Sequence, residues 1–146
     1  MLAVSLAVVA LGLSAGALVT EGAVLVPFWR GLRPEAFLAW YRQHAGLLFR
    51  FFGSLEVVTL LIVFAALAVR WSAAGEERTL LAIAAGLTVA VLAVYPLYFQ
   101  RVNASFESGS IAPERVGEEL GRWAGWHWMR TAFALGAFLA AVAARR

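Results

Sequence analysis

Four long apolar segments follow one another along the chain, covering approximately residues 2–26, 46–69, 79–99 and 128–144. A helix rises 1.5 Å per residue, so ~20 apolar residues cross the ~30 Å hydrocarbon core of a bilayer. Each segment reaches or approaches this length. The sequence therefore predicts an all-α bundle of four transmembrane helices with both termini on the same side. Pro27 is predicted to end the first helix, and Pro96 lies near the end of the third.

Two longer connections, residues 28–45 and 100–127, join the segments in pairs. Each contains a proline followed by a glutamate, Pro34-Glu35 in one and Pro113-Glu114 in the other. Proline is favoured at the first position of a helix, and an acidic side chain is favoured in the first turn. We therefore expect a short amphipathic helix in each connection that leads into the following transmembrane helix.

The composition agrees with a membrane protein. Of the 146 residues, 62% are hydrophobic and 14% are charged, whereas soluble domains have about 45–50% and about 25% respectively. The chain is thus predicted to form one integral membrane domain, residues 1–146, surrounded by the lipid bilayer. The absence of Cys excludes a disulfide scaffold and a zinc–thiolate site. A net charge of +3 without a dense basic run argues against binding to nucleic acid.

Ionisable residues lie inside the predicted spans, but only in the half next to the two long connections. Glu56 lies near the middle of its span, whereas Glu21, Arg50 and Arg130 lie closer to the connections. A charge inside a membrane costs about 2.5–3.5 kcal/mol and faces the bundle interior or a wet cavity. The distribution predicts a polar vestibule that opens toward the two long connections, with Glu56 at its floor. The alternative is that the two glutamates pair with the two arginines and only fix the helix packing.

The fourth segment carries the densest group of candidate residues. Trp123, Trp126, His127 and Arg130 are spaced so that they share one helix face. Indoles stack on flat ligands, arginine binds oxyanions, and histidine transfers protons near neutral pH. An interfacial belt of aromatic side chains with a snorkelling arginine is the alternative. The predicted ligand-binding residues are Trp123, Trp126, Glu21, Glu56 and Arg50.

The stretch from Tyr95 to Phe138 carries a skeleton of Pro96, Asn103 and Trp123-x2-Trp126-His127-x2-Arg130-Thr131. This skeleton resembles the anthrone-oxygenase-like family of small four-helix membrane proteins, much of which is a bacterial domain of unknown function. The resemblance implies a place in the bacterial inner membrane. Fungal members are implied to oxidise anthrones to anthraquinones with O₂, without a metal or organic cofactor. By position, Asn103, His127 and Arg130 would be the polar residues of such a site.

These observations leave several functions open. A chain that lies almost entirely in the membrane favours a non-catalytic accessory subunit of a larger complex, or one that binds a lipid, a quinone or another flat aromatic ligand. The alternative is a cofactor-independent oxygenase acting on an anthrone-like polycyclic phenol, with His127 as base and Arg130 and Asn103 stabilising the oxyanion. A third possibility is a site for haem b or a metal held by His44 and His127, since imidazole is a common ligand. A path for ions or protons through Glu56 is disfavoured, because the halves of the spans farther from the long connections contain no charged residue that could continue it.

Overall fold

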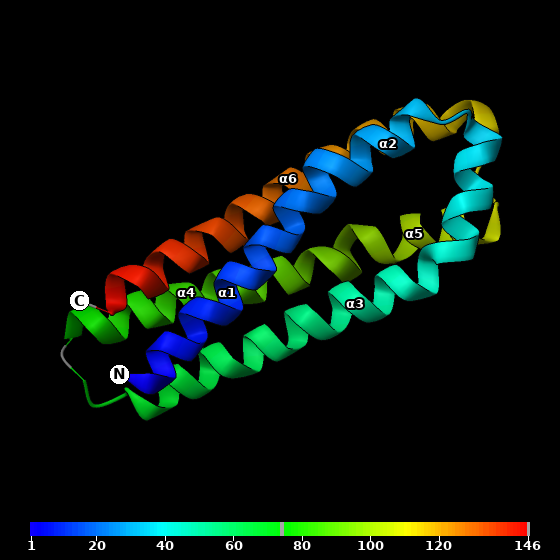
Figure 1. Cartoon of the computed structure of the whole chain (residues 1–146). Helices are drawn as coiled ribbons and strands as arrows, with labels where there is room; N and C mark the ends of the chain where they lie inside the picture. Colours follow the sequence, from blue (N-terminus) through cyan, green and yellow to red (C-terminus); the bar gives the residue numbers. More distant parts are fainter. Residues whose placement is uncertain (74, 146) are drawn as a thin grey trace.

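A computed structural model describes residues 1–73 and 75–145, which form four long helical rods (Figure 1). The first rod consists of α1 (Leu2–Thr20), the π-helix η1 (Glu21–Leu25) and α2 (Val26–Gly31), and the second is α3 (Pro34–Val69). The third consists of α4 (Gly75–Val94), the π-helix η2 (Tyr95–Phe99) and α5 (Gln100–Ser108), and the fourth is α6 (Pro113–Ala144). All four are long and apolar enough to cross a membrane, which confirms the predicted all-α membrane bundle.

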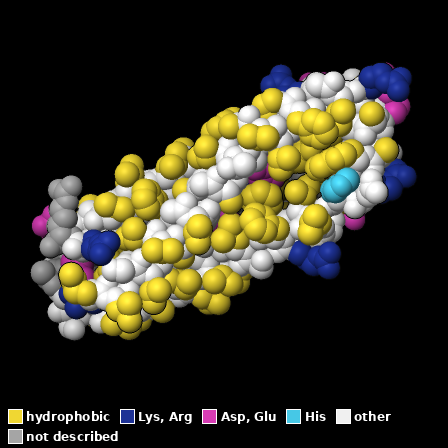
Figure 2. All heavy atoms as spheres, in the orientation of Figure 1, with side chains coloured by type: hydrophobic (Ala, Val, Ile, Leu, Met, Phe, Trp, Pro, Cys, Tyr) yellow, Lys and Arg dark blue, Asp and Glu magenta, His cyan; other side chains and the backbone are white. Residues whose placement is uncertain are grey.

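The rods pack around a common axis. Helix α1 packs against α3 and α6, and α4 packs against the same two helices, so that α3 and α6 lie diagonally across the bundle. The two ends of the chain lie at one end of the bundle, and the two long connections lie at the other (Figure 1). Most basic side chains visible in Figure 2 lie near the two ends of the molecule, with a broad apolar surface between them. This surface is suited to the hydrocarbon of a bilayer.

The prolines begin helices as predicted but do not end them. Helices α3 and α6 start at Pro34 and Pro113. The expected short amphipathic helices are not separate elements, because they are the first turns of α3 and α6. In α3 these turns, cyan in Figure 1, are tilted away from the rest of the helix. The first rod continues past Pro27 to Gly31, which corrects the predicted end at residue 26.

The third rod likewise continues beyond Pro96, to Ser108 instead of residue 99. A wide π-helical turn accompanies each of these prolines. The backbone N–H of Val26 donates to the Glu21 carbonyl, and that of Gln100 donates to the Tyr95 carbonyl, each across five residues. The extra residue in the turn accommodates the missing proline N–H without breaking the helix. Continuing the helix keeps backbone groups paired, which matters most where water is scarce.

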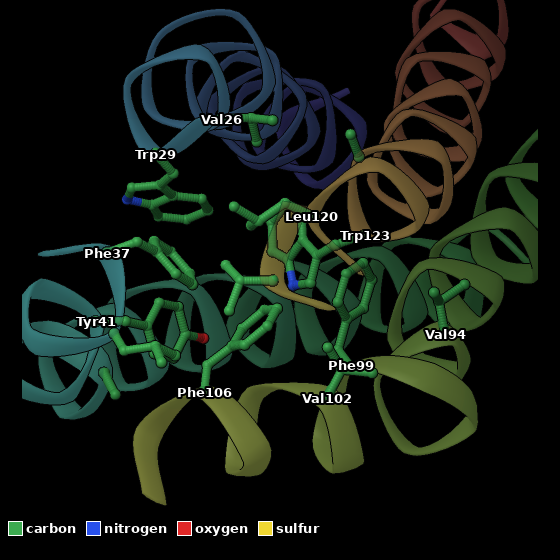
Figure 3. Close-up of a cluster of buried hydrophobic side chains, with 14 residues drawn as sticks. Val26, Trp29, Phe37, Tyr41, Val94, Phe99, Val102, Phe106, Leu120 and Trp123 are labelled. Carbon is green, nitrogen blue, oxygen red and sulfur yellow. The ribbon is translucent and has the colours of Figure 1, made fainter. Parts of the chain in front are cut away.

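The packing differs between the two ends of the bundle. Near the long connections, large aromatic side chains from α2, α3, η2, α5 and α6 form a buried cluster, shown in Figure 3, which includes Trp29, Phe37, Tyr41, Phe99, Phe106 and Trp123. Near the chain ends, the core consists largely of alanines, which include Ala7, Ala66, Ala84, Ala85, Ala137 and Ala141. Small side chains let membrane helices approach closely. The aromatic end is therefore the end where the bundle has room for a cavity.

Candidate ligand-binding cavity

A cavity of about 710 Å³ lies between α3 on one side and α4, η2 and α5 on the other. Its walls are mainly apolar and aromatic, and include Tyr41, Phe49, Phe52, Tyr95 and Trp123. Six side chains with an amide or a charged group also line it: Glu21, Glu56, Gln100, Asn103, Glu107 and Arg130. Ligand sites of this kind usually have volumes of about 300–1,000 Å³ and a few well-placed polar groups. The cavity is therefore large enough for a small polycyclic molecule.

The cavity opens sideways, through the wall of the bundle, and not toward the long connections as the sequence predicted. The exposed residues on its lining come from α3, as Gly46 and Phe49 do, and from η2 and α5, as Pro96 and Ala104 do. These three elements belong to the second and third rods, which are long and apolar enough to cross a membrane. Acidic side-chain atoms are also visible midway along the molecule in Figure 2, recessed between apolar side chains. The arrangement suits a ligand that is dissolved in the membrane.

Arg130 and Glu21 form a buried ion pair at the inner wall. The Arg130 Nη2 atom lies 2.8 Å from Glu21 Oε2, and the guanidinium lies 4.4 Å from the centre of the Phe99 ring. The Glu21 side chain is only 4% exposed. The predicted pairing of a glutamate with an arginine is therefore present for these two residues. Among the described residues, Arg130 Nη1 has no hydrogen-bond partner, so its two N–H groups remain available to a ligand.

His127 lies behind Arg130 and does not line the cavity. Its Nε2 atom lies 2.8 Å from the carbonyl oxygen of Leu18, which can only accept a hydrogen bond. Its Nδ1 atom lies 3.3 and 3.1 Å from Arg130 Nε and Nη2, which can only donate. Glu21 Oε2 also lies 3.4 Å from Nδ1. Because the two arginine N–H donors are closer, we assign the proton to Nε2 and a lone pair to Nδ1. Both ring nitrogens are engaged within the protein.

Glu56 has a different environment from Glu21. Its two carboxylate oxygens lie 2.9 and 3.0 Å from the Ser14 hydroxyl of α1. Glu56 is buried and lines the cavity, and it makes no ion pair within the described part of the chain. Arg50 does not reach it, because Arg50 is exposed on the outer side of α3 and donates from Nε to the Gly46 carbonyl at 3.3 Å. The ion-pair interpretation is therefore wrong for Glu56 and Arg50.

The two tryptophans of the fourth segment point in different directions. Trp123 lines the cavity, donates from Nε1 to Asn103 Oδ1 at 2.9 Å, and stacks nearly parallel to the His127 ring. This bond leaves the Asn103 amide NH₂ free to donate. Trp126 is 37% exposed and stacks on Tyr98 with ring centres 5.1 Å apart. Trp126 and Arg50, both predicted to bind the ligand, therefore lie outside the cavity.

Several residues of the site were not predicted from the sequence. Among them are Ser14, which contacts Glu56, the two tyrosines Tyr41 and Tyr95, and the polar residues Gln100 and Glu107, which line the cavity. Ser14 carried a signal, because it is a polar residue in the middle of the first apolar segment, near the depth of Glu56. The tyrosines carried none, since their types and positions also suit an aromatic belt at the membrane surface.

The two histidines proposed as haem or metal ligands have different surroundings. His44 stacks on Trp40, with ring centres 4.2 Å apart, and its Nδ1 atom lies 2.7 Å from the Trp40 carbonyl oxygen. Both nitrogens of His127 are already hydrogen-bonded. Across residues 1–73 and 75–145, no three His, Cys, Asp or Glu side chains gather where they could hold a metal ion.

The fold and the cavity define a helical membrane-type bundle with an internal cavity lined mainly by apolar and aromatic side chains. The sequence model of the anthrone oxygenase family matches residues 40–140, and the chain belongs to this family. The matched region contains Glu56, Asn103, Trp123, His127 and Arg130, whereas Glu21 and Ser14 precede it. No curated protein and no solved structure matches the chain.

Proposed function

We propose that the cavity binds a flat, anthrone-like polycyclic ketone from the membrane of a bacterium and catalyses its oxidation to a quinone by O₂. The observation that carries the proposal is the free Nη1 end of Arg130, which belongs to a cavity with aromatic walls. A guanidinium and an amide in an apolar site stabilise an oxyanion far better than water does. The name of the family supports the same reaction.

The reaction needs a group that accepts a proton from the substrate and a group that stabilises the negative charge left on the substrate oxygen. Loss of a proton from the methylene carbon of an anthrone turns the ketone into an aromatic oxyanion, which Arg130 and Asn103 would bind. The anion gives electrons to O₂, and a carbon–oxygen bond forms at the former methylene carbon to give a peroxide. The peroxide takes up a proton and loses water, which leaves the second carbonyl. One O₂ is consumed, one oxygen atom enters the quinone, and the other leaves as water.

Glu56 is the proton acceptor in this scheme. An acceptor must face the ligand and have a free lone pair. His127 meets neither condition, because it lies outside the cavity and both its nitrogens are engaged. Glu21 faces the cavity, but it is paired with Arg130, the group assigned to the oxyanion. Glu107 also lines the cavity, but it is exposed at the surface of α5. Glu56 is buried, faces the cavity and has the Ser14 hydroxyl as its one side-chain partner among the described residues, so in this scheme it takes the place of the histidine that the sequence suggested.

Oxygen consumption tests the proposal. Purified protein in lipid nanodiscs is supplied with anthrone in air, and O₂ uptake and quinone absorbance are measured against protein-free nanodiscs to remove the spontaneous reaction. We expect Glu56→Gln to lower the protein-dependent rate by about 100-fold, the scale of one general base. Glu118→Gln, on the exposed side of α6, is the matched control and should keep the rate.

Two results would contradict the proposal in different ways. If anthrone binds, as measured by quenching of tryptophan fluorescence, but is not oxidised faster than in empty nanodiscs, the protein is a ligand-binding subunit instead of an enzyme. If neither anthrone nor anthraquinone binds, the cavity is not a site for this class of ligand.

A further inference from the structure

A contact between the first rod and α6 lies directly behind the cavity wall. Gly22, in η1, is buried against His127 and Trp128. A Cβ atom at this position would lie 2.8 Å from Trp128 Cζ2 and 3.0 Å from His127 Cδ2. Real Cβ atoms essentially never come as close as the first distance. Only glycine therefore lets the backbone of the first rod approach His127 this closely.

We infer that Gly22 and His127 together form a positioning unit that fixes the Arg130 guanidinium toward the ligand. This inference rests on the proposed function, in which Arg130 binds the oxyanion. His127 is a positioning residue here and exchanges no proton with the substrate.

The ring of His127 is held on all sides. Its Nε2–H donates to the Leu18 carbonyl of α1, and one face stacks on Trp123 with only 10° between the ring planes. The Thr131 hydroxyl lies 3.4 Å from Nε2. Because the close approach at Gly22 brings the first rod to the ring, the Leu18 bond depends on that glycine. The ring is therefore fixed in one orientation, with its Nδ1 lone pair directed at Arg130.

The same lone pair sets the orientation of the guanidinium. Arg130 donates to His127 Nδ1 from both Nε and Nη2, and Nη2 also donates to Glu21. These contacts occupy the Nε and Nη2 side of the group and leave Nη1 free. An oxyanion contact depends on donors that are placed before the reaction begins. Loss of the histidine lone pair would let the guanidinium rotate toward Glu21 and away from the ligand.

The test uses a bound ligand that reports its own ionisation. 1-Hydroxyanthraquinone changes its visible absorption when its hydroxyl loses a proton, and the pH midpoint of this change is measured in nanodiscs with and without protein. A cation within ~4–6 Å of an oxyanion lowers such a midpoint by about 1–3 units. We expect wild-type protein to lower the midpoint by this amount.

Variants separate positioning from folding. Gly22→Ala and His127→Gln should raise the midpoint back by about one unit or more, because the guanidinium is no longer held. His127→Asn should stay closer to wild type, since its amide oxygen can replace Nδ1 as the acceptor for Arg130. Gly16→Ala, on the same rod with open space around the new Cβ, is the matched control and should leave the midpoint unchanged. Partial unfolding would release ligand that titrates at the protein-free midpoint, so each variant is titrated with enough protein to bind the same fraction of the ligand as wild type.

The outcomes distinguish this inference from the proposed function. If Gly22→Ala and His127→Gln keep the wild-type midpoint while Arg130→Met raises it, Arg130 binds the oxyanion without the positioning unit, and only the inference is overturned. If wild-type protein binds the ligand but does not lower the midpoint, Arg130 does not bind the oxyanion, and both are overturned.

Discussion

Replacing Arg130 by Met should destabilise the protein, because it leaves the Glu21 carboxylate buried without its cation. The two groups are 2.8 Å apart at their nearest atoms, and the side chains are 10% and 4% exposed. Two unit charges ~4 Å apart attract each other by about 4 kcal/mol at an effective dielectric constant of 20. Removal of one partner of a buried pair costs about 3–5 kcal/mol. We expect a loss of about 3 kcal/mol in the free energy of unfolding, since a charge inside a membrane costs about 2.5–3.5 kcal/mol.

The double variant Glu21→Gln/Arg130→Met should recover most of this loss, because it removes both charges together. Replacing a buried ion pair by uncharged side chains of similar size is often neutral. The free energies are measured by titrating the protein in mixed micelles with SDS and following the helical circular dichroism. The double-mutant cycle should give a coupling of at least ~2 kcal/mol, well above the ~0.3–0.5 kcal/mol found for independent sites.

Arg50→Met is the matched control. Arg50 is also an arginine in the same half of the bundle, but it is exposed, and among the described residues its side chain bonds only to a backbone carbonyl of its own helix. Its replacement should leave the free energy of unfolding unchanged within error. The reasoning is refuted if Arg130→Met costs less than ~1 kcal/mol, or if the two single variants add without coupling.

Two further predictions compare matched positions. Gly53→Leu should weaken anthraquinone binding at least ~10-fold, because a side chain at Gly53 extends into the cavity without meeting another atom; Gly86→Leu, equally open but outside the cavity, should not, and equal effects on fluorescence quenching would show that the ligand binds elsewhere. Trp29→Phe should leave stability nearly unchanged or raise it, since within the described residues Trp29 Nε1 is buried without a hydrogen-bond partner. Trp123→Phe should lower the free energy of unfolding by about 1 kcal/mol, because it leaves Asn103 Oδ1 without its donor. An SDS titration in which Trp29→Phe is the more destabilising of the two variants would contradict this account.

The sequence by itself determined the helices and the depth of the charged residues. Hydrophobic length and the helix-starting prolines Pro34 and Pro113 act locally, so they can be read without knowledge of the partners. The concentration of Glu21, Glu56 and Arg130 in one half of the membrane follows from the same count of residues. These features were enough to predict a bundle with a polar site near its long connections.

The sequence did not determine how the two internal prolines are accommodated. Pro27 and Pro96 were expected at helix ends, but π-helical turns carry the helices past them. A proline in isolation favours a break because it lacks an N–H. In the folded bundle, packing against the neighbouring helices and the cost of unpaired backbone groups in a membrane favour the continuous helix.

Only the tertiary structure decided which polar groups meet. Helical spacing placed Trp123 and Trp126 on one face, yet the packing of η2 and α5 against α6 leaves Trp123 in the cavity and Trp126 outside it. His127 was the natural base by residue type, but its partners, Leu18 and Arg130, occupy both ring nitrogens. A side chain's chemistry depends on the groups within hydrogen-bond reach, and Leu18 is 109 residues away in the sequence. That contact exists only after the first and last rods have packed together.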